Sequence, residues 1–91
     1  MRTESTYNGW TNYPTWRINL ELWDNYEIDE FKGLDKYLLS EALKERTEMY
    51  ILESTIEGIG RDYAMAFIHQ VNFYEIAEML FERNEIETET I

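Results

Sequence analysis

The chain has 91 residues, no cysteine, and 19 acidic against eight basic residues, which gives a formal net charge of −11. The lack of cysteine excludes disulfides and thiolate metal sites, and the negative charge disfavours direct binding to nucleic acid or to an anionic membrane. A content of 44% hydrophobic and 15% aromatic residues is too high for a disordered chain. We therefore predict one folded acidic domain over residues 1–91, soluble and cytoplasmic, with flexible ends at 1–6 and 86–91.

Two patterns compete in the segment Thr15–Trp23. Its apolar residues alternate with polar ones, as in a half-buried strand, but they also repeat at the three-and-four spacing of one helical face. Asn12 can cap a helix, and Pro14 falls in the first turn, where a missing N–H costs nothing. No other segment alternates convincingly, so a strand here would lack a partner. The sequence therefore predicts a helix over 13–24.

This first helix carries apolar residues on two sides. One stripe is Tyr13, Trp16, Leu20 and Trp23, and the other is Ile18 and Leu22. The polar strip is Arg17, Glu21 and Asp24. A helix with two apolar sides lies at the centre of a small bundle or offers its aromatic side to another chain.

The next segment predicts a long helix over 34–57. Most of its apolar residues fall on one side, and they are Leu38, Leu39, Ala42, Leu43, Met49, Leu52 and Ile56. Gly58 suits the left-handed position just past a helix end. A shorter helical pattern follows over 61–70.

The last predicted helix, 73–84, has the clearest start. Asn72 is an N-cap residue with Glu75 three positions later, a variant of the capping box that satisfies two backbone donors. Together the four segments predict an all-α fold, a small single-domain bundle of about four helices. Because a chain of this length buries only a thin core, dimerisation is plausible.

Two short stretches resemble a known protein family. Tyr7–Trp16, "YNGWTNYPTW", is similar to the N-terminal signature of small, mostly uncharacterised proteins encoded by phages, plasmids and archaea. Val71–Leu80, "VNFYEIAEML", resembles their C-terminal stretch, in which an aromatic residue is followed shortly by Glu-Ile-Ala. Pro14 departs from the signature, where a Glu or similar residue is expected. The resemblance implies a mobile-element context and supplies no established activity.

Catalytic chemistry has few candidates in this chain. The lack of cysteine excludes Cys-His catalysis, and the presence of only one histidine, His69, excludes a di-iron site built from two Glu-x-x-His motifs. We expect His69 to be a surface or structural residue. The pairs Glu45/Glu48 and Glu75/Glu78 could hold magnesium for nucleotide pyrophosphate hydrolysis, which we keep as an alternative. The main prediction is a non-enzyme without cofactor or metal.

Glutamates line one side of two predicted helices. The rows are Glu41, Glu45 and Glu48 on 34–57, and Glu75, Glu78, Glu82 and Glu85 on 73–84. Helical projection places the first row away from the centre of the apolar arc and the second row on the polar side of its helix. The 19 carboxylates are similar in number to the roughly 18 phosphate charges on about 30 Å of duplex DNA. Such a surface can occupy the basic groove of a nucleic-acid-binding host protein.

Two classes of function fit these features. The first is a non-enzymatic inhibitor of the anti-CRISPR or anti-restriction type, which blocks a DNA-binding defence protein by DNA mimicry and uses Tyr7 and Trp10 as additional anchors. The second is a structural or adaptor module that pairs through an aromatic helix face, a homodimer included. Two simpler explanations also stay open: the acidic residues only keep the domain soluble, and the aromatic residues only build its core.

Overall fold

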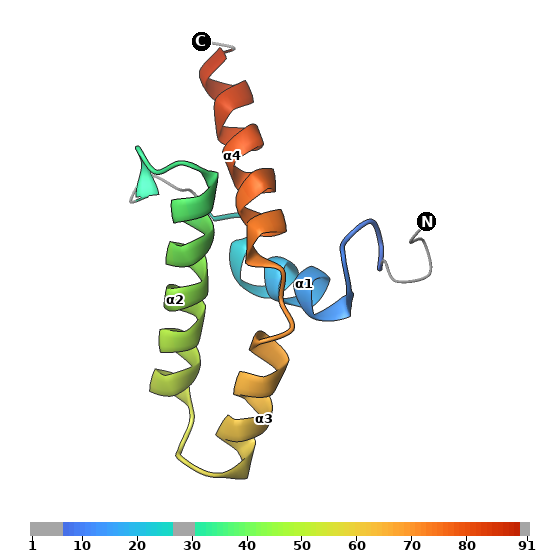
Figure 1. The fold of residues 1–91 in the computed structure, drawn as a ribbon, viewed down its shortest axis with the longest axis vertical. Helices are drawn as coiled ribbons and strands as arrows, with labels where there is room; N and C mark the ends of the chain where they lie inside the picture. Colours follow the sequence, from blue (N-terminus) through green and yellow to red (C-terminus); the bar gives the residue numbers. More distant parts are fainter. Residues whose placement is uncertain (1–6, 27–30, 90–91) are drawn as a thin grey trace.

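The computed structural model describes residues 7–26 and 31–89, with side chains described as far as Arg83. These residues form the helices α1 (Tyr13–Ile18), α2 (Lys36–Ser54), α3 (Ile59–Ile68) and α4 (Phe73–Glu89). A π-helical segment, η2 (Asn19–Trp23), directly continues α1. In Figure 1, α2 and α4 lie side by side in opposite directions, α3 links their lower ends, and α1 runs across the junction of α3 and α4. The predicted all-α fold of about four helices is confirmed.

A tight turn precedes α1. The backbones of Tyr7 and Trp10 exchange two hydrogen bonds of 2.7 Å, and the φ angles of Asn8 and Gly9 are 49° and 87°. Positive φ at both central residues defines the turn that Asn-Gly favours, because these two residues tolerate that conformation best. The turn brings the Tyr7 ring against Tyr13 and Trp16 of α1.

The predicted first helix is helical throughout, but its second half is wound differently. Asn12 caps α1 by accepting the Thr15 N–H, and η2 ends with the Asp24 N–H donating to the Asn19 carbonyl at 2.7 Å. This five-residue spacing is that of a π-helix, which is rare and breaks the α-helical period.

The change of winding corrects the two predicted apolar stripes. In a π-helical turn, residues five apart come together, so Trp23 joins Ile18 in the core, 3% and 8% exposed. Leu20, predicted to share a stripe with Trp23, is 51% exposed. The indole Nε1 of Trp23 donates to the buried Thr47 hydroxyl at 3.2 Å, which fixes the ring against α2.

Helix α2 buries a different side from the one predicted. Its buried residues are Leu39, Ser40, Leu43 and Thr47, whereas Leu38, Met49 and Leu52 are about half exposed. The inward side of α2 is the one that packs against α4 and the Trp23 ring, and it includes the small polar residues Ser40 and Thr47. The apolar pattern alone could not distinguish it.

Both ends of α2 differ from the prediction. The helix starts at Lys36 because the Asp35 carboxylate accepts the Leu38 N–H, and it stops at Ser54 because Thr55 is extended. The Arg61 guanidinium donates to the carbonyls of Leu52 and Thr55, which closes this end. Gly58, expected to terminate α2, has a φ of 148° and instead precedes α3.

The remaining boundaries are close to those expected. Helix α3 covers Ile59–Ile68 where 61–70 was predicted, and α4 starts at Phe73 as predicted but extends to Glu89. Residues 1–6 and 90–91, where flexible ends were predicted, lie outside the described residues.

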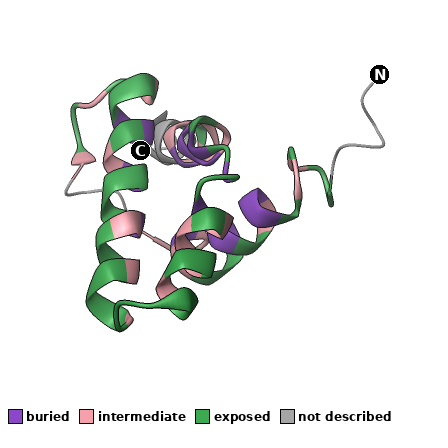
Figure 2. Ribbon diagram, turned by 60° about the horizontal axis from the view of Figure 1, so that its bottom comes forward, coloured by how far each residue is buried: buried purple, intermediate pink, exposed green. Residues whose placement is uncertain are grey.

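The core lies where all these elements meet. Its buried members are Ile18, Trp23, Leu39, Leu43, Ile68, Val71, Phe73, Ile76, Ala77 and Leu80. Figure 2 shows the buried positions on the sides of the helices that face one another, with exposed positions on the outer sides. No helix in the described residues is long and apolar enough to cross a membrane.

Candidate protein-binding surfaces

The glutamate row on α4 faces away from the core. Ile76 and Leu80 are fully buried, and on an α-helix the residues two positions after them, Glu78 and Glu82, lie on nearly the opposite side. Glu82 is exposed and Glu78 partly exposed, and neither forms an ion pair with another described residue. Glu85 continues the row in sequence, but its side chain lies outside the described part. We call Glu78 and Glu82 the acidic face of α4.

The row on α2 has a different character. Glu41 and Glu45 are exposed, while the Glu48 side chain is 28% exposed and lies 3.8 Å from His69 Nε2. The exposed Leu38, Met49 and Leu52 described above lie on the same outer side of the helix. This surface is therefore mixed, acidic and apolar, and it is not a pure row of charge.

The two rows do not combine into one acidic surface. Helices α2 and α4 pack along each other and bury Leu43 and Leu80 in the same core. Sides opposite to a shared core point in diverging directions, so the two rows face different parts of the surroundings. A partner that binds a flat surface can contact one row at a time.

Glu75, the first member of the α4 row, has a structural contact. Its Oε1 accepts the backbone N–H of Thr11 at 2.9 Å, a residue 64 positions earlier. The predicted capping box is therefore only half formed. The Asn72 side chain accepts the Glu75 N–H at 3.1 Å, but the Glu75 carboxylate does not return to the Asn72 N–H.

The Asn72 N–H is bound instead by a residue of α1. It donates to the Thr15 hydroxyl at 2.8 Å, and that hydroxyl donates to the Asn12 Oδ1 at 2.6 Å. The Asn12 Nδ2 donates in turn to the Gln70 carbonyl at 2.9 Å. The N-cap of α1 and the N-cap of α4 thus satisfy each other. We call Asn12, Thr15, Asn72 and Glu75 the cap clasp.

The cap clasp joins the two stretches singled out in the sequence. Tyr7–Trp16 supplies Asn12 and Thr15, and Val71–Leu80 supplies Asn72 and Glu75. Each asparagine was recognisable as a cap, but their link through Thr15 was not foreseen, because nothing in the sequence placed the two helix ends together. Thr15 is fully buried, as expected of a hydroxyl with two hydrogen bonds.

The N-terminal aromatic residues divide between core and surface. Trp10 packs against the core, and Tyr7 is 39% exposed. The Tyr7 ring contacts the rings of Tyr13 and Trp16, each with a centroid distance of 5.1 Å, and Tyr13 also meets Phe67 at 6.1 Å. These edge-to-face contacts hold a rigid aromatic cluster at the surface.

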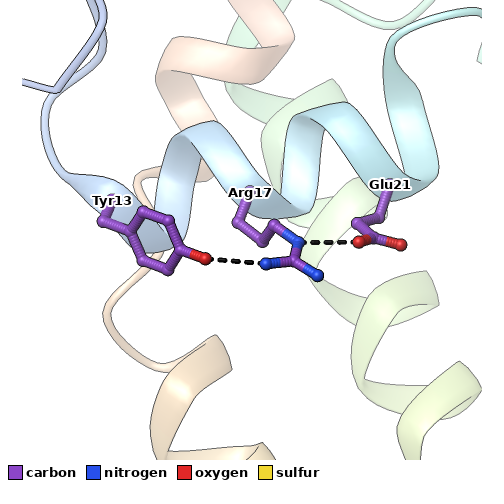
Figure 3. A network of polar contacts seen from close by, with 3 residues as sticks. All are labelled: Tyr13, Arg17 and Glu21. Atoms are coloured by element: carbon purple, nitrogen blue, oxygen red, sulfur yellow. Dashed lines mark hydrogen bonds and ion pairs between the residues drawn. The ribbon is translucent and has the colours of Figure 1, made fainter.

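A row of polar contacts crosses the outer side of α1 and η2. Figure 3 shows the Arg17 guanidinium between Tyr13 and Glu21, donating to the Tyr13 hydroxyl at 2.7 Å and to the Glu21 carboxylate at 2.6 Å. The Glu21 carboxylate, followed by the Tyr13 hydroxyl, raises the pKa of the Arg17 guanidinium. Arg17 is charged at every physiological pH, as an exposed arginine always is.

An open groove of about 410 Å³ lies between the first half of α2 and the α3–α4 junction. Its polar lining includes Glu41, Lys44 and His69, and its aromatic lining includes Tyr37 and Tyr74. The His69 side chain is 61% exposed, as expected of a surface histidine. The buried polar side chain in its lining is Ser40, whose hydroxyl donates to the Tyr37 carbonyl at 2.7 Å.

The structure does not assemble the predicted magnesium ligands. Glu45 and Glu48 lie on the outer side of α2, and Glu75 is bound to Thr11 while Glu78 lies on the diverging outer side of α4. Within residues 7–26 and 31–89, no group of three or more His, Cys, Asp or Glu side chains is placed to hold an ion.

Comparison of the chain with protein-family models, curated proteins and solved structures found no match. The resemblance of its two motifs to phage, plasmid and archaeal proteins therefore stays a prediction.

Proposed function

We propose that this chain is a non-enzymatic inhibitor of a DNA-binding defence protein, of the anti-CRISPR or anti-restriction type, and that the acidic face of α4 occupies the target's basic DNA-binding surface. The observation that carries this proposal is the outward row of Glu78 and Glu82, without ion-pair partners among the described residues. The mobile-element context implied by the two motifs gives such a surface a use. The target is present in the cytoplasm of the host cell.

The spacing of the row supports a phosphate-like surface. From Glu78 to Glu82 a helix rises about 6 Å, at 1.5 Å per residue, so the two carboxylates of the acidic face are spaced about 6 Å apart along the axis. One strand of B-DNA carries a charge about every 3.4 Å. The two densities are of the same order, so lysine and arginine side chains that bind a strand can also approach α4.

Rigidity also supports the proposal. The cap clasp fixes the start of α4 to α1, and the Arg83 guanidinium donates to the carbonyls of Asp24 and Tyr26 from further along the same helix. A helix held at both places keeps its carboxylates in position, so little conformational entropy is lost when a partner binds. Long-range attraction to a basic surface then accelerates association.

The net charge favours such a partner over nucleic acid itself. At −11 the chain repels phosphate backbones, while a basic DNA-binding channel attracts it. Charge-driven binding weakens as salt screens the attraction. The proposal therefore predicts a partner that the chain binds tightly at low salt and releases at high salt.

The experiment is capture of host proteins on the immobilised chain at low and at high salt, with two variants compared. Glu78→Gln with Glu82→Gln removes two charges from the acidic face, and Glu53→Gln with Glu57→Gln removes two exposed charges elsewhere. We expect the wild type and the second variant to capture a DNA-binding protein at low salt, and the first variant to lose it.

Equal capture by both double variants would show that net charge alone is responsible and would overturn the assignment to α4. Capture that persists at high salt through apolar contacts would favour the adaptor alternative. Magnesium-dependent nucleotide hydrolysis that is lost in Glu45→Gln and Glu75→Gln variants would favour the enzyme alternative.

A further inference from the structure

The outer side of α1 and η2 combines exposed apolar residues with one positive and one negative residue. Leu20 is 51% exposed, and Trp16, one helical turn before it, is partly exposed. Beside them the side chains of Arg17 and Glu21 are 46% and 51% exposed and lie 2.6 Å apart. We call Trp16, Arg17, Leu20 and Glu21 the pairing face.

The order of residues on the pairing face is self-complementary. Along the helix, a large apolar residue is followed one turn later by a smaller one, and a positive residue is followed one turn later by a negative one. When two identical helices meet antiparallel about a two-fold axis, each residue at the start of the row lies opposite one at the end. Trp16 then meets Leu20 of the second copy, and Arg17 meets Glu21.

Charge also selects this side of the molecule for contact with a second copy. Residues 13–23 carry one arginine and one glutamate, so their net charge is zero, while α4 has six glutamates against one arginine, a net charge of −5. Two chains of net charge −11 repel each other least where the facing surfaces are neutral.

The pairing face is already ordered in the single chain. The Trp16 ring packs against Tyr7 at 5.1 Å, and Arg17 is held by both Tyr13 and Glu21. Ordering long side chains is one of the costs of association, and here that cost is already met within the monomer. Tryptophan and arginine are also the residue types that most often dominate interface energies.

We propose that the chain forms a two-fold symmetric homodimer through the pairing face, with the α1–η2 helices antiparallel and the acidic faces of α4 outside. This inference goes beyond the proposed function and does not depend on it. A dimer of this kind presents two acidic faces at once. Its existence can be tested without any knowledge of a target.

Sedimentation velocity over a range of protein concentrations measures the association directly. The wild type is expected to shift from monomer to dimer as concentration rises, and Leu20→Glu is expected to stay monomeric because it places a charge in the contact. Leu20 is half exposed, so the substitution leaves the core intact, and an unchanged circular dichroism spectrum and Tm confirm that the variant folds.

A mixing experiment tests whether the charged residues of the pairing face meet across the dimer. Arg17→Glu carries two negative residues on the pairing face and Glu21→Arg carries two positive ones, so each alone is expected to dimerise at least tenfold more weakly than the wild type. Mixed one to one, they are expected to form a heterodimer, because each glutamate then faces an arginine. The Arg17–Glu21 pair within one chain is absent from both variants, so it cannot explain the recovery.

The control pair separates the pairing face from total charge. Lys44→Glu and Glu53→Arg change the net charge by the same amounts at exposed positions of α2. Each is expected to form homodimers like the wild type. A wild type that stays monomeric at all concentrations, or a mixture of the pairing-face variants that does not associate, would overturn the proposal. Control variants that lose self-association as completely as the pairing-face variants would also overturn it, because net charge alone would then explain the loss.

Discussion

At its start α4 carries polar side chains that contact other parts of the chain, whereas two turns later the glutamate on its outer side forms no ion pair with a described residue. Asn72 and Glu75 are bound to Thr15 and Thr11 through the cap clasp. Glu82 has no ion-pair partner among the described residues. Two polar residues within three turns of the same helix can thus differ in role. One stabilises the fold through its contacts, and the other is available to a partner, and only their contacts distinguish them.

This comparison predicts that substitutions in the cap clasp lower stability, while substitutions in the acidic face leave it unchanged. The largest loss is expected for Thr15→Val, because the buried hydroxyl makes two hydrogen bonds and both partners would lose them. We expect the free energy of unfolding to fall by about 3 kcal/mol. Urea denaturation measures it, and Thr15→Ser, which keeps the hydroxyl, is the control that should lose clearly less.

Asn12→Ala removes the N-cap of α1 and the tether to Gln70 together. A lost cap costs about 1 kcal/mol and a lost tertiary hydrogen bond about as much, so the expected loss is about 2 kcal/mol. Asn12→Asp keeps the acceptor but not the amide donor, so thermal and urea unfolding should place it between Ala and the wild type. An aspartate variant as unstable as the alanine variant would contradict a separate capping contribution.

Glu75→Ala is expected to cost about 1 kcal/mol, because it removes one charge-assisted hydrogen bond from an exposed backbone N–H. The loss should exceed that of Glu78→Ala measured under the same conditions. If the two substitutions had equal effects, the contact between Glu75 and Thr11 would contribute nothing to stability.

The double variant Glu78→Gln with Glu82→Gln is expected to change stability least, by within about 0.5 kcal/mol, because neither carboxylate has an ion-pair partner among the described residues. Urea denaturation checks this before any binding experiment. A loss of more than about 2 kcal/mol would place these glutamates in the fold.

Much of this fold could be predicted from local signals. Asn12 and Asn72 mark the starts of α1 and α4, because a cap depends on residues within one turn. The π-helical winding of η2 was not predictable, because it depends on Trp23 reaching Thr47 across the core. The periodicity of 13–24 therefore predicted the helix and placed Trp23 on the wrong stripe.

The same limit applies to the candidate site. The sequence indicated that Glu78 and Glu82 lie on the side of α4 away from the core, since projection onto one helix depends only on spacing. It could not show that the rows of α2 and α4 diverge, because that follows from how the helices pack. Nor could it show that Glu75 binds Thr11, 64 residues away.

The measurement that tests the central claim most directly is competition between the chain and duplex DNA for the captured partner. At low salt, added duplex should displace the bound wild-type chain, because both occupy the same basic surface. A partner that holds the duplex and the chain at the same time, with the chain's affinity unchanged, would contradict the account.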